Sequence, residues 1–263
     1  MIANLKSSIS HPNLGVEMHK VTIPQRVIDR VILRCGKEHI FDDIEPSKTA
    51  LVVVYMQNAF MLEGVAHAYV KTSQDIVPNI NHLAAAVRRT GGLVVWIKTV
   101  WKEDQRIEWS VLDRMSLPQW TTKRVKALSR GSKGWELWEE LDAQAEDLVV
   151  EKVRFSAFIQ GSSNLHQVLQ GHGVDTLLIT GTVTNVCCES TARDAMMLNY
   201  KTIMVSDGNA AANDDEHNAS LTSFYSIFGD VMSTDHVISC LDLNARAKKD
   251  LEGDSSAMVG HEE

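Results

Sequence analysis

Six apolar runs of strand length recur along the chain, separated by segments with helical spacing. The runs are rich in β-branched residues and apolar on both faces, which is typical of strands covered on both sides in a parallel sheet. They lie at residues 50–55, 93–98, 147–152, 176–180, 202–206 and, more weakly, 230–234.

The segments between these runs have the pattern of amphipathic helices. In 75–92 the apolar residues recur every three or four positions before a Gly-Gly stop. Similar spacing with cap or glycine signals occurs in 162–173, 185–200 and 214–229. The alternation predicts the α/β class: a three-layer αβα sandwich with a mostly parallel six-stranded sheet.

One domain, over residues 47–245, accounts for this pattern. Residues 1–46 form an N-terminal extension whose only periodic part, 23–34, is compatible with one helix or with an arm on a neighbouring subunit. Residues 246–263 are polar and predicted to be disordered. Residues 99–135 contain four tryptophans and form a long connection, or excursion, between two strands. We expect this excursion to cover a site.

Composition narrows the class of protein. The formal net charge is −8 with acidic and basic residues mixed, which provides no basic surface for nucleic acid. The four cysteines show no C-x-x-C spacing, so they predict neither a disulfide framework nor a zinc knuckle. The N-terminus lacks the apolar stretch of a signal peptide, and no segment is apolar enough to span a membrane. We expect a soluble cytoplasmic protein with no membrane partner.

Ligands of open parallel sheets bind beyond the carboxyl ends of the strands, so residues that end a strand are the first functional candidates. Here they are Tyr55, Lys98, Lys152, the stretch 181–188 and Asp207.

Cys187 is the candidate nucleophile in this set. A strand ends in a glycine-containing turn, Thr184 or Asn185 is placed to cap the next helix, and Cys187 falls in the first turn of that helix. The helix dipole and unpaired backbone N–H groups would there stabilise a thiolate and an oxyanion. The alternative is a buried structural cysteine, which fits the adjacent Cys188 better.

Lys152 ends an otherwise apolar strand. Such a lysine either extends to solvent or lies in the site, and the sequence leaves both open. In the site, its ammonium would favour the Cys187 thiolate and a negatively charged transition state, as electrostatic support rather than as a base.

Three motifs resemble the isochorismatase-like cysteine hydrolases, which include nicotinamidases, N-carbamoylsarcosine amidases, biuret hydrolases and ureidoacrylate amidohydrolases. They are ALVVVYMQNAF at the first strand, KVRFSAF at the third, and GTVTNVCCESTARDA at the strand-to-helix turn, in the family's order within residues 47–242. The residues of the last two motifs are most similar to those of the ureidoacrylate branch.

The resemblance implies roles for individual residues. Cys187 would be the nucleophile, Lys152 the lysine of the catalytic triad, and the N–H groups of Val183 and Cys187 the oxyanion hole, in a turn where the family often has a non-proline cis peptide. It implies hydrolysis of a small ureido or amide compound through a thioester, without a cofactor. It also implies a homo-oligomer, a tetramer or a dimer.

The first motif departs from the family at Tyr55, where the family has the aspartate that carries the proton. A phenol has a reference pKa near ~10 and is a poor base at neutral pH. Three explanations stay open: a substituted and impaired form of an active parent, a natural variant that uses the phenol, and a pseudoenzyme that binds without turnover.

Other site assignments complete the expectation. Asn58, Phe60 and Trp101 are predicted to line the substrate pocket, with ordinary packing as the alternative for each. Metal-binding relatives use an Asp and His cluster, whereas the corresponding region here offers His67 and a histidine-free stretch, so no metal is predicted. The segment GTVTN is too poor in glycine for a dinucleotide site.

Overall fold

The computed structural model describes residues 18–66, 68–102 and 109–259, the side chains up to residue 247. His67, considered above for a metal site, lies outside the described residues.

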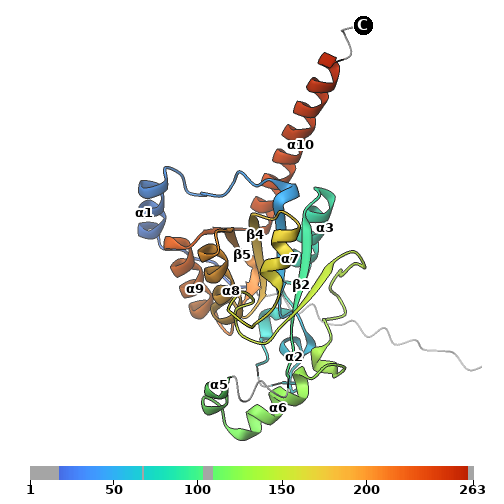
Figure 1. Cartoon of the computed structure of the whole chain (residues 1–263). Helices are drawn as coiled ribbons and strands as arrows, with labels where there is room; N and C mark the ends of the chain where they lie inside the picture. The colour runs from blue at the N-terminus through green and yellow to red at the C-terminus, as the bar shows by residue number, and fades with distance from the viewer. Residues whose placement is uncertain (1–17, 67, 103–108, 260–263) are drawn as a thin grey trace, which may run out of the picture.

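All six expected strands are present and pair in parallel to form one sheet, which confirms the predicted fold class (Figure 1). Their order across the sheet is β3-β2-β1-β4-β5-β6. The strands are β1 (Thr49–Val54), β2 (Leu93–Thr99), β3 (Leu148–Lys152), β4 (Thr176–Thr182), β5 (Lys201–Ala210) and β6 (Asp230–Met232).

Helices cover both faces of the sheet and form two hydrophobic cores. One core joins α3 (Val77–Arg89) and α10 (Thr234–Val259) to the sheet. The other contains α7 (Leu165–Gly171), α8 (Glu189–Met197) and α9 (Asp214–Ile227), and α1 (Gln25–Cys35) packs against α9. The other elements are α2 (Asn58–Met61), α5 (Ser110–Arg114), α6 (Pro118–Leu128), the 3₁₀ turns 46–48, 71–73 and 133–135, and the π-helical turn Thr184–Cys188.

Both terminal segments depart from the simplest expectation. The periodic part of the N-terminal extension forms helix α1, and it packs on this chain's own α9. Helix α10 continues to Val259, so the prediction of disorder is wrong for residues 246–259. This stretch contains Ala, Lys, Arg, Leu and Glu, which are strong helix formers, and it extends a helix already fixed by packing (Figure 1).

The strand order reverses between β1 and β4: β2 and β3 are added on one side of β1, and β4, β5 and β6 on the other. In open α/β sheets a ligand crevice forms at such a point, beyond the carboxyl ends of the strands. Val54 at the end of β1 lies opposite Gly181 of β4. A Cβ atom on Gly181 would lie 2.0 Å from the Val54 carbonyl oxygen, so only glycine allows the two strands to approach this closely.

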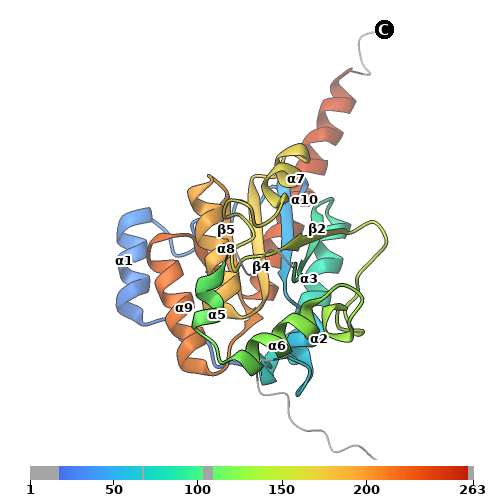
Figure 2. The same cartoon turned by 60° about the horizontal axis from the view of Figure 1, so that its bottom comes forward.

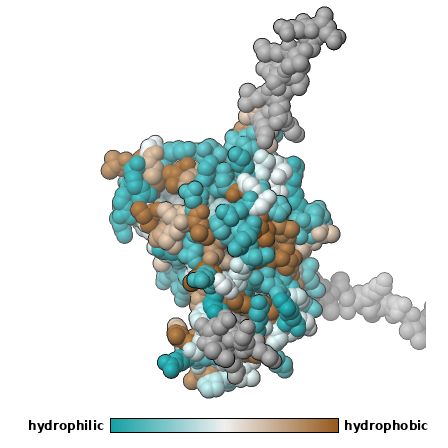
Figure 3. Space-filling model, in the orientation of Figure 1, coloured by the Kyte–Doolittle hydropathy of each residue, from teal (hydrophilic) through white to brown (hydrophobic). Residues whose placement is uncertain are grey.

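Helices α5 and α6 belong to the long excursion after β2 and lie beyond the strand ends, across the front of the molecule in Figure 2. The backbone N–H of Trp101 donates to the Leu128 carbonyl (2.9 Å), which ties the start of the excursion to the end of α6. In Figure 3 hydrophilic residues cover most of the visible surface, and hydrophobic residues form separate patches. No described helix has an apolar stretch long enough to cross a bilayer.

Candidate active site

Tyr55 follows β1 at the reversal point in a left-handed backbone conformation, with φ of 56°. This region is unfavourable for a bulky residue and must be held by its surroundings. The Tyr55 N–H donates to the Ile97 carbonyl (3.0 Å), and its carbonyl accepts from the Thr182 hydroxyl (3.0 Å). The ends of β2 and β4 therefore fix the direction in which the phenol projects.

The polar pair after Tyr55 supports the surrounding loops. The buried Gln57 side chain accepts from the Thr99 N–H (2.7 Å) and donates to the Thr99 and Trp135 carbonyls (3.1 and 2.8 Å). Asn58 donates to the Lys133 carbonyl (3.1 Å) and is not among the described residues that line the cavity. The prediction that Asn58 lines the pocket is wrong, because its amide satisfies a loop carbonyl.

Lys152 is fully buried at the end of β3, which excludes the solvent-exposed alternative. Its Nζ atom lies 2.5 Å from the Tyr55 hydroxyl, 2.6 Å from the Arg154 carbonyl oxygen and 2.5 Å from the Phe155 carbonyl oxygen. Burial lowers the pKa of Lys152 to about 8, against the opposing effect of the two neighbouring cysteines. The side chain is therefore an ammonium at neutral pH and titrates just above it.

Cys187 is buried in the π-helical turn that precedes α8. The predicted cap is wrong, since this turn has no side-chain cap and the regular helix begins only at Glu189. Burial raises the pKa of Cys187, although the Lys152 charge, a hydrogen bond with Tyr55 and one with the Val183 backbone act in the opposite direction. The expected stabilised thiolate is absent at rest, because desolvation outweighs these effects and the group is a thiol.

The phenol of Tyr55 joins the two other groups. It interacts with Lys152 on one side, and its hydrogen bond with Cys187 contributes to the pKa of both groups. Its oxygen also lies 3.1 Å from the Arg154 carbonyl. Burial raises the Tyr55 pKa well above its ordinary value, so the phenol is neutral. Its single hydrogen serves one of these acceptors at a time, and a proton can move along the chain of three groups.

A cavity of about 210 Å³ opens beside these groups, and Tyr55 and Cys187 form part of its wall. Phe60 and Trp101 line this cavity, and Val183 of the expected oxyanion hole lies in the same wall; contact of Phe60 and Trp101 with a substrate stays a prediction. The peptide bond between Thr182 and Val183 is cis. The oxyanion role of the Val183 and Cys187 N–H groups stays a prediction.

The other strand-end candidates have structural roles. Lys98 lies over the Trp135 ring, with Nζ 3.1 Å from the ring centroid. The Asp207 carboxylate accepts from the backbone and hydroxyl of Thr234 at the start of α10 (2.7 and 2.8 Å). Cys188 is completely buried near the Thr180 carbonyl and fits the structural interpretation.

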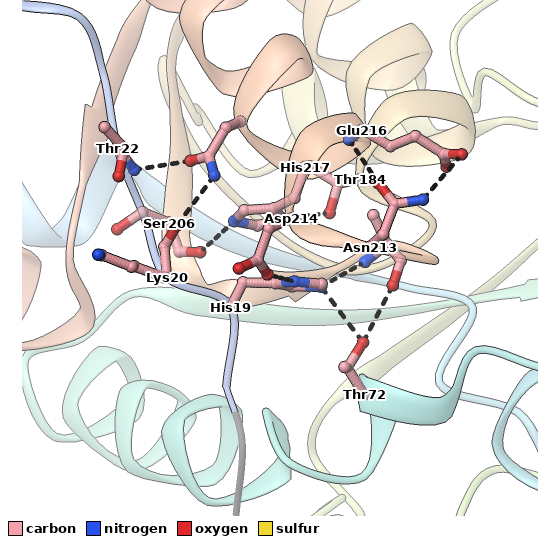
Figure 4. Close-up of polar contacts among 12 residues, drawn as sticks. His19, Lys20, Thr22, Thr72, Thr184, Ser206, Asn213, Asp214, Glu216 and His217 are labelled. Carbon is pink, nitrogen blue, oxygen red and sulfur yellow. Dashed lines mark hydrogen bonds and ion pairs between the residues drawn. The ribbon is translucent and has the colours of Figure 1, made fainter.

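Sequence reasoning missed a histidine pair that supports the turn carrying Cys187. The Thr184 hydroxyl lies 2.9 Å from Nδ1 of the buried His217, whose Nε2 lies 3.1 Å from the Ser206 carbonyl (Figure 4). The carbonyl accepts, so Nε2 carries the proton and Nδ1 accepts from Thr184. His19 stacks on His217 at 4.4 Å between ring centroids, and its Nδ1 lies 2.7 Å from the Asp214 carboxylate. No sequence spacing indicates this contact, because His19 lies near the N-terminus and His217 in α9, far apart along the chain.

His217 predicts how stability depends on pH. Burial, with the neighbouring His19, lowers the pKa of His217 to about 4, whereas the ordinary value is 6.5. Below about pH 6.5 the unfolded chain therefore binds a proton at His217, whereas the folded chain binds it only below about pH 4. The free energy of unfolding falls as the pH falls through this range. We expect the His217 contribution to be about 2 kcal/mol between about pH 7.5 and pH 5.

Urea unfolding at these two pH values, for the protein and for His217→Gln, isolates this contribution. The glutamine variant should lose less stability on acidification, and the difference between the two losses is the titration of His217. Asp214 is present in both proteins, so its own titration cancels. Equal losses in the two proteins would contradict the prediction.

Among the described residues, no three or more His, Cys, Asp or Glu side chains are grouped so that they could hold a metal ion. The wall of the cavity instead carries a thiol and a phenol, and the phenol contacts a buried amine.

Comparisons with known proteins match most of this chain to one family. The model of the isochorismatase domain matches residues 49–236. The ureidoacrylate amidohydrolase RutB of Klebsiella pneumoniae is 33% identical over 213 residues, covering 74% of this chain and 88% of that protein. A RutB from Pseudomonas savastanoi is 32% identical over 209 residues, covering 73% and 83%.

Two solved structures extend the comparison. The cysteine hydrolase from Pseudomonas syringae has a TM-score of 0.65 at 32% identity, covering 77% of this chain and 96% of that one. The N-carbamoylsarcosine amidase from Thermoplasma acidophilum has a TM-score of 0.57 at 28% identity, covering 72% and 97%.

Proposed function

The chain belongs to the isochorismatase family of hydrolases, and we propose that it is a cysteine-dependent amidohydrolase of a small ureido or amide compound. The observation that carries this proposal is the meeting of Cys187, Tyr55 and Lys152 beside one cavity at the reversal point of the sheet. The RutB relatives, named for their action on ureidoacrylate, support the same bond type. Cytoplasmic location and homo-oligomerisation are part of the proposal and rest on the sequence.

The contacts around Lys152 allow it to act as the proton acceptor in place of the family's aspartate. A neutral amine has two N–H groups and one lone pair. With its N–H groups on the Arg154 and Phe155 carbonyls, its lone pair faces the Tyr55 hydroxyl at 2.5 Å. A proton can then move from the Cys187 thiol to the Tyr55 oxygen while the Tyr55 proton moves to Lys152. Lys152 thus becomes a base through Tyr55, beyond the electrostatic role expected from the sequence.

The reaction then follows in two halves. The Cys187 sulfur attacks the carbonyl carbon, and the resulting oxyanion lies at the N–H groups of Val183 and Cys187. The C–N bond breaks as the leaving nitrogen receives the proton held by Tyr55 and Lys152. Water next attacks the thioester and gives its proton to the same pair, the C–S bond breaks, and the proton returns to sulfur. The products are the carboxylic or carbamic acid and ammonia or an amine.

A pH profile of ammonia release tests this function. Because Lys152 must be neutral, kcat/KM should rise with pH and level off above about 8, the pKa to which burial lowers the Lys152 amine. A panel of ureidoacrylate, biuret, N-carbamoyl amino acids, nicotinamide and simple amides covers the ureido and amide classes. Intact-mass measurement during turnover should detect the acyl group on Cys187. A profile that is flat from about pH 6 to 9 would contradict the role of Lys152.

A binding protein on the same fold is the second candidate, and one observation favours it. Cys187 is a thiol at rest, and Lys152 makes its hydrogen bonds to Tyr55 and two backbone carbonyls. The site is therefore stable without an ionised Cys187. This candidate predicts measurable affinity for an amide, no release of ammonia and no covalent adduct. Ammonia release that depends on Cys187 excludes it.

A further inference from the structure

We propose that the substrate group accepted beside Cys187 is uncharged and apolar, with a six-membered ring as the group that fits. This inference rests on the proposed function and narrows its substrate class. It separates this chain from hydrolases of ureido acids, whose substrates carry a carboxylate into the site.

Five aromatic side chains in the described part of the chain contribute to the wall. Trp101, Trp109 and Phe155 line the cavity, and the Trp109 and Phe155 rings meet edge to face with centroids 4.9 Å apart. On the side of the catalytic groups, Tyr55 and Phe60 stack with centroids 4.9 Å apart and planes 11° apart. Such rings offer a large apolar surface and edge-to-face contacts to another ring.

Aliphatic side chains fill the wall between the rings. They come from Leu112 of α5, Leu128 of α6, and Val183 and Val186 of the turn that carries Cys187. An apolar ligand group that enters this space leaves water and gains free energy in proportion to its buried area. A polar group that is strongly hydrated in water loses free energy of hydration when it enters this space.

The charge at the cavity is already balanced. Among the described lining residues only Arg124 is charged. Its Nη2 atom lies 2.5 Å from the Asp113 carboxylate, and its guanidinium carbon lies 5.6 Å from the centroid of Trp101. Lys152 directs its contacts to Tyr55 and two carbonyls and is not among the lining residues. A carboxylate that lost its water here would meet no cation among the described lining residues other than Arg124, whose charge Asp113 already balances, and this makes its entry costly.

The volume suits one ring. A cavity of about 150 Å³ lined by apolar side chains is enough to bind benzene. The cavity here, of about 210 Å³, therefore accommodates a benzene ring with its amide directed to Cys187.

A matched pair of ligands tests the proposal without requiring turnover. 4-Methylbenzamide and 4-carbamoylbenzoate share the ring and the amide and differ in a methyl against a carboxylate. Calorimetric binding to Cys187→Ala, which cannot form the thioester, should favour 4-methylbenzamide by about 100-fold or more. If neither compound binds, or if the carboxylate binds equally well or better, the proposal is wrong.

A charge placed in the wall provides a second measurement. In the Cys187→Ala background, Leu112→Lys should weaken binding of 4-methylbenzamide by about 10-fold or more and strengthen binding of 4-carbamoylbenzoate. Val111→Lys is the matched control, because Val111 lies on the same helix, is 60% exposed and does not line the cavity. It should leave both affinities unchanged. If Leu112→Lys behaves like the control, the assignment of this wall to the ligand is wrong.

Turnover by the unaltered protein separates the two proposals. If 4-methylbenzamide binds with the expected preference but no ammonia is released from any amide, the substrate class stands and the hydrolase function fails. If ammonia is released only from carboxylate-bearing amides, the hydrolase function stands and this inference fails.

Discussion

Cys187→Ala is expected to abolish ammonia release, lowering kcat by at least about 10⁴-fold, because Cys187 is the only thiol among the described residues that line the cavity. The thiol is buried at the wall of the cavity and is hydrogen-bonded to the Tyr55 phenol. The covalent adduct seen by intact mass should disappear together with the activity. Binding of an unreactive amide should persist, because the cavity wall otherwise stays in place.

The neighbouring cysteine gives the matched control for this loss. Cys188→Ala removes a thiol of the same size, equally buried and one position along the chain, but near the Thr180 carbonyl. This variant should lose about 1–2 kcal/mol of stability through the small cavity left behind, and should keep the adduct and most of the turnover. If Cys188→Ala lost the activity and Cys187→Ala kept it, the assignment of the nucleophile would be reversed.

Tyr55→Asp is expected to raise kcat/KM at neutral pH by about 100-fold or more. A carboxylate with an ordinary pKa of about 3.9 is ionised at neutral pH, whereas the phenol depends on the small neutral fraction of Lys152. The acid limb of the pH profile should accordingly move to lower pH. Thermal unfolding should show a loss of stability, because the variant removes the buried ring that stacks on Phe60; the better tolerance of aspartate for the left-handed conformation at φ 56° offsets part of this loss.

Tyr55→Phe is the partner of this experiment and distinguishes the three explanations for the departure from the family. It keeps the ring that stacks on Phe60 but removes the hydroxyl between Cys187 and Lys152. If Tyr55 is active, Phe inactive and Asp faster, the phenol is a working but weaker proton carrier. If only Asp is active, the tyrosine is an impairing substitution. If all three are inert on the whole panel, the chain is a binding protein and the proposed mechanism is wrong.

The sequence alone predicted the layers and the positions of the main catalytic candidates. Apolar runs of strand length and helices with a regular apolar stripe are local patterns. They predict the elements of the structure correctly because each element buries its own apolar face. The candidates Tyr55, Lys152 and Cys187 followed from their places at strand ends, which parallel pairing brings to one edge. The family motifs then separated these three from Lys98 and Asp207.

Predictions failed where the outcome depended on contacts between distant segments. Asn58 has the same local context as Phe60, but its amide meets a carbonyl of the loop at Lys133. Thr184 or Asn185 was expected to cap a helix, but neither does, and the Thr184 hydroxyl contacts His217 of another helix. A polar side chain takes the partner that the fold brings nearest, and a local pattern does not identify that partner.

The sequence by itself determined an α/β hydrolase scaffold with a thiol, a lysine and an unexpected phenol at the strand ends. The tertiary structure decided the state of these groups. Burial keeps Cys187 a thiol, lowers the Lys152 pKa to about 8 and places the Tyr55 hydroxyl between them. It also decided that the cavity wall is aromatic and that its one charged lining residue among those described is already paired. Desolvation and pairing depend on everything that surrounds a group in space, and this is not contained in the residues beside it in the chain.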